Sequence, residues 1–146
     1  LVADAAELHL VEADGRQFPA TWPVVDVDAV LVGQLFGNLF NNASKYRHPE
    51  RRLQLSVAWE HRGDRVVCQV SDNGIGFPPE QAEGILQPFT RLHSQEDYPG
   101  TGLGLATCKR IVEAHDGRLQ AAGHIDTGAT FTFDLPAAHS EERLEQ

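Results

Sequence analysis

Three glycines at alternate positions, Gly100, Gly102 and Gly104, stand directly before a segment with helical periodicity. Glycine has no Cβ atom, so this loop can adopt positive φ and expose its amide N–H groups. Apolar residues over 103–115 recur at helical spacing, and Gly117 is expected to end the helix. The first N–H groups of a helix are unpaired and lie at the positive end of its dipole. The loop therefore predicts an anion site or a plain connection, and alone it does not decide between them.

A second glycine-containing segment, 72–76, follows a predicted buried strand. Apolar residues over 66–71 indicate that the strand ends at Asp72. Asp-Asn-Gly is ordinary turn chemistry, but Gly76 follows two residues after Gly74, which is more than a turn needs. We expect the Asp72 carboxylate to lie beside open backbone, where it can accept a hydrogen bond from an amine-bearing ring.

A third segment, 28–46, has the pattern of a long amphipathic helix. An α-helix turns by about 100° per residue, so Asn38, Asn42 and Lys45 fall together on a polar stripe beside the apolar face. Two amide oxygens four residues apart can bind one hard cation, and Lys45 can reach a phosphate. The alternative is a solvated helix face, which the modest helix propensity of asparagine disfavours.

Taken together, these motifs resemble the catalytic and ATP-binding domain of histidine kinases. Five motifs occur in the family's order and spacing over roughly residues 24–136: Asn38-x-x-x-Asn42-Ala-x-Lys45-Tyr46, Asp72-x-Gly74-x-Gly76, Phe89-x-Arg91, Gly100-Thr-Gly-Leu-Gly104 and Gly128-Ala-Thr-Phe-Thr-Phe133. The segments 45–49 and 89–102 further resemble phytochrome-type photosensor kinases, a class of photoreceptor.

This resemblance implies a two-layer α+β sandwich of the Bergerat ATP-binding type, which is shared with type II topoisomerases, mismatch-repair ATPases and a heat-shock chaperone. We expect a mixed, mostly antiparallel sheet with about three helices on one face, in line with the strand and helix patterns. The third would be a short helix that starts at Pro78, because proline is favoured in the first turn of a helix. The catalytic domain is expected to span 1–136, followed by a polar tail over 137–146. ATP would lie between the two long helices, under a mobile lid at about 93–101.

The resemblance also implies a role for each site residue. Asp72 would accept the adenine amino group, and Gly74 and Gly76 would let the ring lie close. Asn42 would bind Mg²⁺, and Asn38 would support it or share the ion. The other expected site residues are Lys45 at a phosphate, Tyr46 beside the base, Arg91 at the γ-phosphate, and Gly100, Thr101, Gly102, Leu103, Gly104 and Leu105 around the phosphates. Thr130 is expected either to support the Asp72 carboxylate through its hydroxyl or to be an ordinary β-branched strand residue.

The phosphate acceptor is expected to lie outside this chain. None of the seven histidines occurs as His-Glu or His-Asp followed by the Arg and Pro that mark a phosphoacceptor helix. His115 precedes Asp116, a glycine and a predicted strand, so we interpret it as a core or helix-terminal histidine. Hydrolytic members of the superfamily have Glu where this chain has Asn38. A carboxamide cannot act as a general base at neutral pH, which favours phosphoryl transfer over hydrolysis.

The sequence therefore predicts an enzyme domain, the ATP-binding half of a two-component sensor histidine kinase. It would transfer the γ-phosphate of ATP to a histidine on a separate dimerisation domain of the same protein, and a response-regulator receiver domain would be a further partner. The alternative is a regulatory nucleotide-binding module of a sensor that acts mainly as a response-regulator phosphatase. The chain has neither the Gly-x-x-x-x-Gly-Lys-Ser/Thr loop of P-loop proteins nor the Gly-x-Gly-x-x-Gly motif of dinucleotide-binding folds, so these two nucleotide-binding folds are excluded.

Composition limits which partners and which cellular compartment fit this chain. A net charge of −9 argues against nucleic acid or an anionic membrane as the main partner, so local amides and a metal must hold phosphate. Cys68 and Cys108 lack metal or redox spacing, which favours buried thiols in the reducing cytoplasm. The sequence has no apolar run of membrane-spanning length. The absence of Met, even at position 1, leads us to expect a segment of a longer chain.

Overall fold

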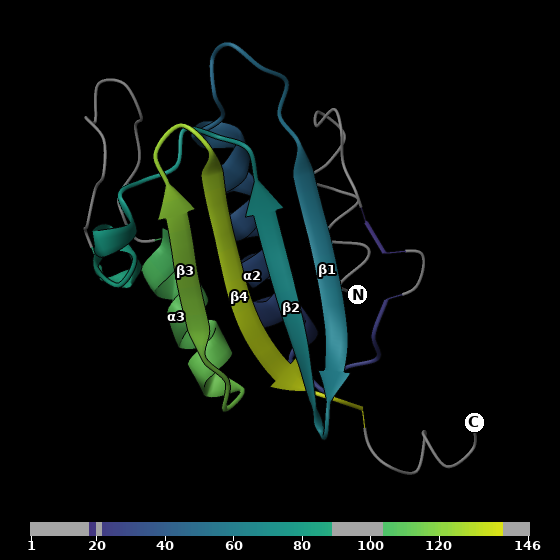
Figure 1. The fold of residues 1–146 in the computed structure, drawn as a ribbon. Helices are drawn as coiled ribbons and strands as arrows, with labels where there is room; N and C mark the ends of the chain where they lie inside the picture. The colour runs from purple at the N-terminus through teal and green to yellow at the C-terminus, as the bar shows by residue number, and fades with distance from the viewer. Residues whose placement is uncertain (1–17, 20–21, 89–103, 139–146) are drawn as a thin grey trace.

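One sheet and two α-helices make two layers in the computed structural model, which describes residues 18–19, 22–88 and 104–138 (Figure 1). The strands are β1 (Leu55–Arg62), β2 (Arg65–Asp72), β3 (Leu119–His124) and β4 (Gly128–Pro136), in the order β1-β2-β4-β3. Each strand pairing found in the described ranges is antiparallel, and the sequence predicted a mixed, mostly antiparallel sheet. The predicted two-layer α+β architecture is confirmed.

The helix α2 (Ala29–Lys45) begins and ends where its sequence pattern predicts. The Asp28 carboxylate caps it by accepting hydrogen bonds from the N–H groups of Val30 and Leu31, at 3.0 and 3.1 Å, as N-terminal aspartates commonly do. One face of the helix is buried against the sheet: Val32, Leu35, Phe36, Leu39, Phe40 and Ala43. The predicted polar stripe lies beside this buried face, and its residues Asn38, Asn42 and Lys45 are half-buried.

The helix α3 (Gly104–Ala114) ends differently from the expectation. Asp116, with φ of 60°, takes the left-handed position after the helix, where glycine is usual. Its N–H donates to the Glu113 carbonyl, and the N–H of Gly117 donates to that of Val112. Gly117 is needed for another reason, because a Cβ atom there would lie 2.1 Å from the carbonyl oxygen of Asp134 on β4.

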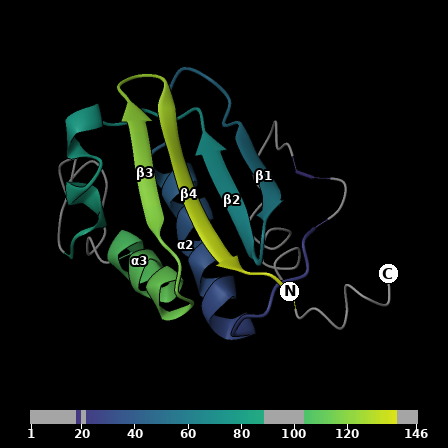
Figure 2. The ribbon, with the colours of Figure 1, turned by 60° about the horizontal axis from the view of Figure 1, so that its bottom comes forward.

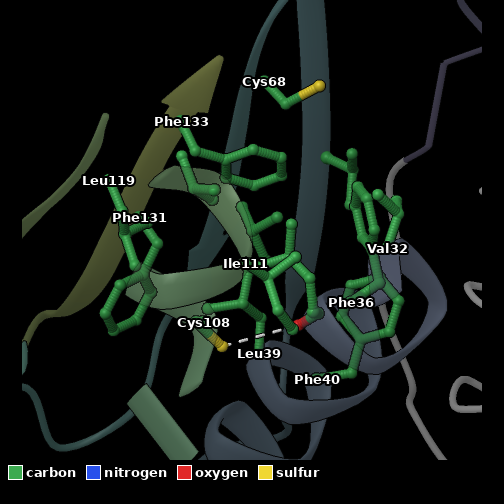
Figure 3. Close-up of a cluster of buried hydrophobic side chains, with 14 of the residues drawn as sticks. Val32, Phe36, Leu39, Phe40, Cys68, Cys108, Ile111, Leu119, Phe131 and Phe133 are labelled. Atoms are coloured by element: carbon green, nitrogen blue, oxygen red, sulfur yellow. Dashed lines mark hydrogen bonds between the residues drawn. The ribbon is translucent and has the colours of Figure 1, made fainter. Parts of the chain in front are cut away.

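The core lies between the sheet and the two helices, and Figure 3 shows Phe131 and Phe133 from β4 beside side chains of both helices. The rings of Phe36 and Phe133 meet edge to face, with centroids 5.5 Å apart. Cys68 and Cys108 are free and buried, and burial raises the pKa of each thiol to about 12. Both thiols therefore stay protonated, and the prediction that they are buried is confirmed.

Two short 3₁₀ turns, η1 (Pro79–Gln81) and η2 (Gly84–Leu86), stand where a third helix was expected. They lie beside α3 and the β3 edge of the sheet (Figure 2). Within the described ranges, no helix is both long enough and apolar enough to cross a membrane. Packing continues past residue 136, since Ala137 and Ala138 are buried and donate their N–H groups to the carbonyls of Asp64 and Val24. The domain boundary predicted there stays a prediction.

Candidate functional site

The Asp72 carboxylate lies at the end of β2, where the chain leaves the sheet. Its Oδ1 accepts a hydrogen bond from the Gly74 N–H at 2.9 Å. Burial raises the pKa of the Asp72 carboxyl above its ordinary value, and hydrogen bonds from the N–H groups of Gly74 and Ala129 partly counteract this effect. The site therefore holds a half-buried carboxylate in a fixed orientation, suited to accept a further hydrogen bond from an amine.

The two glycines after Asp72 are required by backbone packing. A Cβ atom on Gly74 would lie 2.5 Å from the carbonyl oxygen of Tyr46. Gly76 has φ of 67°, and a Cβ atom there would lie 2.0 Å from the carbonyl oxygen of His124. The 72–76 loop is therefore in contact with the end of α2 on one side and with the β3–β4 turn on the other.

The polar stripe of α2 connects this loop with the start of α3. At one end, Asn38 Nδ2 donates a long, 3.4 Å hydrogen bond to the carbonyl oxygen of Gly104. At the other end, the carbonyl oxygen of Tyr46 accepts the N–H of Ile75 at 2.9 Å. Asn42 lies between them, half-buried, and its side chain makes no hydrogen bond to any other described residue. Its amide oxygen is thus available for a ligand.

Lys45 lies at the same end of the stripe as Tyr46. Its Nζ is 5.1 Å from the centre of the Tyr46 ring, a cation–π contact. Both side chains are half-buried. The predicted residues that these contacts link along α2, the 72–76 loop and the start of α3 are Asn38, Asn42, Lys45, Tyr46, Asp72, Gly74, Gly76 and Gly104.

The phosphate-binding part of the prediction is only partly described. Gly104 is the exposed first residue of α3, and a Cβ atom there would meet no described atom within 4 Å, so packing does not require glycine. Leu105 packs against the core. The remaining predicted residues lie outside the described ranges: Arg91, Gly100, Thr101, Gly102, Leu103 and the rest of the expected lid, 93–101.

Thr130 is not placed beside the Asp72 carboxylate. Its hydroxyl oxygen lies 3.0 Å from that of Ser71 on the neighbouring strand. Side chains alternate between the two faces of a strand, so Ser71 and Asp72 point to opposite faces. The β4 residue paired with Asp72 is Ala129. Of the two interpretations of Thr130, this geometry fits the ordinary strand residue.

His115 uses both ring nitrogens to hold the two helices together. Its Nε2 accepts the Asp28 N–H at 3.1 Å, and its Nδ1 lies 2.8 Å from the Ile111 carbonyl oxygen, to which it donates. The ring therefore joins the start of α2 to the end of α3. This placement fits the interpretation of His115 as a helix-terminal histidine.

The sequence pattern did not single out Arg51, whose guanidinium bonds to carbonyl oxygens of the 72–76 loop and of the β3–β4 turn. It also missed His48, which lies 2.8 Å from the Asp126 carboxylate. The only available signal was a basic stretch, 45–52, in a chain of net charge −9. That signal does not indicate that these side chains turn back onto backbone.

The family of the chain follows from comparison with known proteins. The family model described as "Histidine kinase-, DNA gyrase B-, and HSP90-like ATPase" matches residues 27–139. The chain therefore belongs to this family of ATPases. Within the family, it is an ATP-binding catalytic domain of the histidine-kinase type, because its similar relatives are phytochrome-type and other sensor histidine kinases.

Two curated relatives illustrate this similarity. Cyanobacterial phytochrome A of Nostoc sp. is 40% identical over 119 residues, which cover 82% of this chain and 15% of the relative. The circadian input-output histidine kinase CikA of Synechococcus elongatus is 39% identical over 124 residues, which cover 84% of this chain and 16% of the relative. The chain thus spans less than a fifth of the length of these proteins.

Solved structures agree on the fold. The mycobacterial sensor histidine kinase MprB superposes with a TM-score of 0.76 at 24% identity, over 93% of both chains. Full-length ShkA, solved in complex with AMPPNP, superposes with a TM-score of 0.73 at 26% identity, over 94% of this chain and 29% of that one. The predicted fold and family are confirmed.

Proposed function

We propose that this domain binds ATP with Mg²⁺ along the polar stripe of α2 and donates the γ-phosphate to a histidine on a dimerisation domain of a longer protein. One observation carries the proposal: the stripe joins the Asp72 loop at Tyr46 to the first residue of α3 at Asn38. Asn38 and Tyr46 are eight positions apart, which corresponds to a rise of about 12 Å along the helix axis. That length suits a nucleotide laid with its base at Asp72 and its phosphates at α3.

The base would be recognised by the Asp72 carboxylate. Adenine carries an exocyclic amine that can donate to Oδ2, because Oδ1 already accepts the Gly74 N–H. Guanine carries a carbonyl oxygen at the equivalent position, which the carboxylate would repel. Tyr46 would pack near the base, where the Lys45 charge already contacts its ring.

The phosphates would lie toward the start of α3. The N-terminus of a helix favours anions through its free N–H groups and dipole, and we assign the Gly104 and Leu105 amides to this role together with residues 100–103. Arg91 would contact the γ-phosphate, and Lys45 would reach the phosphate nearest the base by turning away from the Tyr46 ring. Full-length ShkA, which shares this fold, was solved in complex with AMPPNP, and this supports an ATP-like ligand for the domain.

The available oxygen donors fit Mg²⁺. A cation of this kind is bound by one or two protein oxygens together with substrate phosphates and water, and Asn42 offers an amide oxygen with no other described partner, with Asn38 four residues earlier. When bound, Mg²⁺ would offset charge on the phosphate oxygens during transfer. The part of the chain that the structure describes offers no competing group of three or more His, Cys, Asp or Glu side chains.

Transfer is favoured over hydrolysis because Asn38 cannot take a proton from water at neutral pH. We propose that the acceptor histidine lies on another domain, and that a response-regulator receiver domain takes the phosphate from it. A cytoplasmic location is part of this proposal, and the two free, buried thiols are compatible with it.

Phosphotransfer measures the proposal directly. Labelled ATP and Mg²⁺ are mixed with the chain and with the histidine-bearing domain of its parent protein, with and without the receiver domain. Asn42→Ala should lower label transfer at least about tenfold, the loss of one ion contact at 1.4 kcal/mol or more. Asn41→Ala is the matched control, because Asn41 is the same residue type on the same helix but is exposed. Equal effects of the two variants, or label on the chain alone, would contradict the proposal.

A further inference from the structure

Arg51 lies in the connection between α2 and β1, and its guanidinium donates to three backbone carbonyl oxygens. Its Nε bonds to Asn73 at 2.8 Å, and its Nη2 bonds to Gly74 at 3.1 Å and to Asp126 at 2.5 Å. The first two carbonyls belong to the 72–76 loop, and the third belongs to the β3–β4 turn. One side chain therefore fixes two segments that are far apart in sequence.

Other contacts hold the same two segments together. The Asp126 N–H donates to the Ile75 carbonyl oxygen at 2.7 Å. His48 Nε2 donates to Asp126 Oδ1 at 2.8 Å while its Nδ1 accepts the Glu50 N–H. The His48 side chain is 12% exposed and that of Asp126 is 75% exposed, so the histidine is the anchored partner. The turn is thus held by the same connection that carries Arg51.

The β3–β4 turn and the 72–76 loop are packed so closely at Gly128 that a side chain there would not fit. A Cβ atom on Gly128 would lie 2.0 Å from the carbonyl oxygen of Asp72. Three carbonyl oxygens that converge on one point repel one another unless a donor group lies between them. Arginine is suited to this task, because its planar guanidinium carries five N–H groups in a fixed arrangement, whereas lysine offers one compact charge.

The bond to Asn73 acts directly on the Asp72 side chain. The Asn73 carbonyl and the Gly74 N–H belong to one planar trans peptide unit and point in opposite directions. Arg51 bonds to this unit from one side, and Asp72 Oδ1 accepts the N–H on the other side. A rotation of this peptide would move the donor that orients the carboxylate.

We infer that Arg51 is a positioning residue that sets the orientation of the Asp72 carboxylate and thereby the preference of the site for adenine over guanine. This inference rests on the role proposed for Asp72. A carboxylate turned away from its bonded orientation no longer meets the adenine amine. GTP presents a carbonyl oxygen at that position and is repelled by the carboxylate, so loss of the fixed orientation does not weaken its affinity.

The test compares Arg51→Lys with Arg62→Lys in the 146-residue chain. Arg62 is the matched control, because it is exposed at the opposite end of the sheet, where it pairs with Glu60. Dissociation constants for ATP and GTP are measured by calorimetry, and melting temperatures are measured without nucleotide. Arg51→Lys should weaken ATP binding about tenfold, which corresponds to about 1.4 kcal/mol, and should change GTP binding less than about twofold.

A fall in the ATP-to-GTP preference for Arg51→Lys but not for Arg62→Lys supports the inference. Equal weakening of both nucleotides would instead assign Arg51 to the phosphates, and a lower melting temperature with an unchanged preference would make its role structural only. Either result overturns the inference. Arg51 is exposed, so the substitution opens no buried cavity. Arg51→Gln, which keeps one amide donor, is the second variant and should lower the preference further.

Asp72→Asn separates this inference from the function on which it rests. If Asp72→Asn abolishes the preference and Arg51→Lys leaves it intact, only the positioning role fails. If Asp72→Asn leaves the preference intact, the proposed adenine contact fails and the positioning role fails with it.

Discussion

Replacing Asp72 by asparagine should change ATP binding and folding stability in opposite directions. The amide keeps the shape of the carboxylate and an oxygen for the Gly74 N–H, which lies 2.9 Å from Oδ1. It loses the negative charge. Hydrogen bonds to charged groups contribute about 1.5–3 kcal/mol and are roughly twice as strong as neutral ones. The expected loss of binding free energy is therefore about 1–1.5 kcal/mol, or roughly a 5- to 15-fold weaker affinity for ATP.

The sign of the stability effect follows from the pKa of Asp72. Burial raises this pKa above its ordinary value of 3.8, so the folded chain holds the proton more tightly than the unfolded chain does. The stabilising contribution is fully present below the unfolded pKa and is lost as pH rises through the folded one. At neutral pH the ionised carboxylate lowers the free energy of unfolding. Asparagine removes this cost, so the empty variant should melt at a higher temperature.

Two measurements check the prediction. Calorimetric titration gives the ATP affinity, and thermal unfolding between acidic and neutral pH gives stability. The gain in melting temperature should shrink as pH falls below the raised pKa of Asp72. Asp64→Asn is the control, because Asp64 is exposed at the β1–β2 turn. If Asp72→Asn lowered the melting temperature and left ATP affinity unchanged, the carboxylate would be a structural group and not the adenine contact.

Asn38→Glu should raise ATP hydrolysis and lower transfer to histidine, because it supplies a carboxylate that can accept a proton; an unchanged rate of phosphate release would refute the role of this position. Gly128→Ala should destabilise the domain by at least about 3 kcal/mol, since its Cβ atom would meet the Asp72 carbonyl at a φ of 137°. Gly33→Ala, within α2, should stabilise the domain by about 0.5–1 kcal/mol, because its Cβ atom meets no described atom within 4 Å. Urea denaturation measures the free energy of unfolding of the Gly128 and Gly33 variants, and equal changes in the two would contradict the packing argument. Asp28→Ala should cost about 1 kcal/mol by the same measurement, because two N–H groups lose their acceptor, and an unchanged midpoint would exclude a capping role.

Local chemistry made much of this protein predictable from sequence. The 3.6-residue period and the capping Asp28 define α2, and the same period identifies the buried face of α3. Alternation of apolar residues defines the strands to within a few residues. The family also followed from sequence, since its motifs are short, contiguous and ordered along the chain. The sequence also predicted a short helix after Pro78, but its pattern does not distinguish an α-helix from the two 3₁₀ turns that form there.

Contacts between distant segments were decided only by the tertiary structure. Glycine was expected in the left-handed position after α3, but Asp116 occupies it and Gly117 instead makes room for the backbone of β4. Thr130 belongs to a predicted motif, yet strand register alone determines that Ala129 and not Thr130 pairs with Asp72.

Arg51 shows the same limit most clearly. Nothing in its neighbourhood in the sequence indicates that it bonds to the carbonyls of Asn73, Gly74 and Asp126. Backbone carbonyls are the same in every residue, so an acceptor carries no sequence signature. A side chain that recognises backbone can be assigned only after the fold has brought the two segments together.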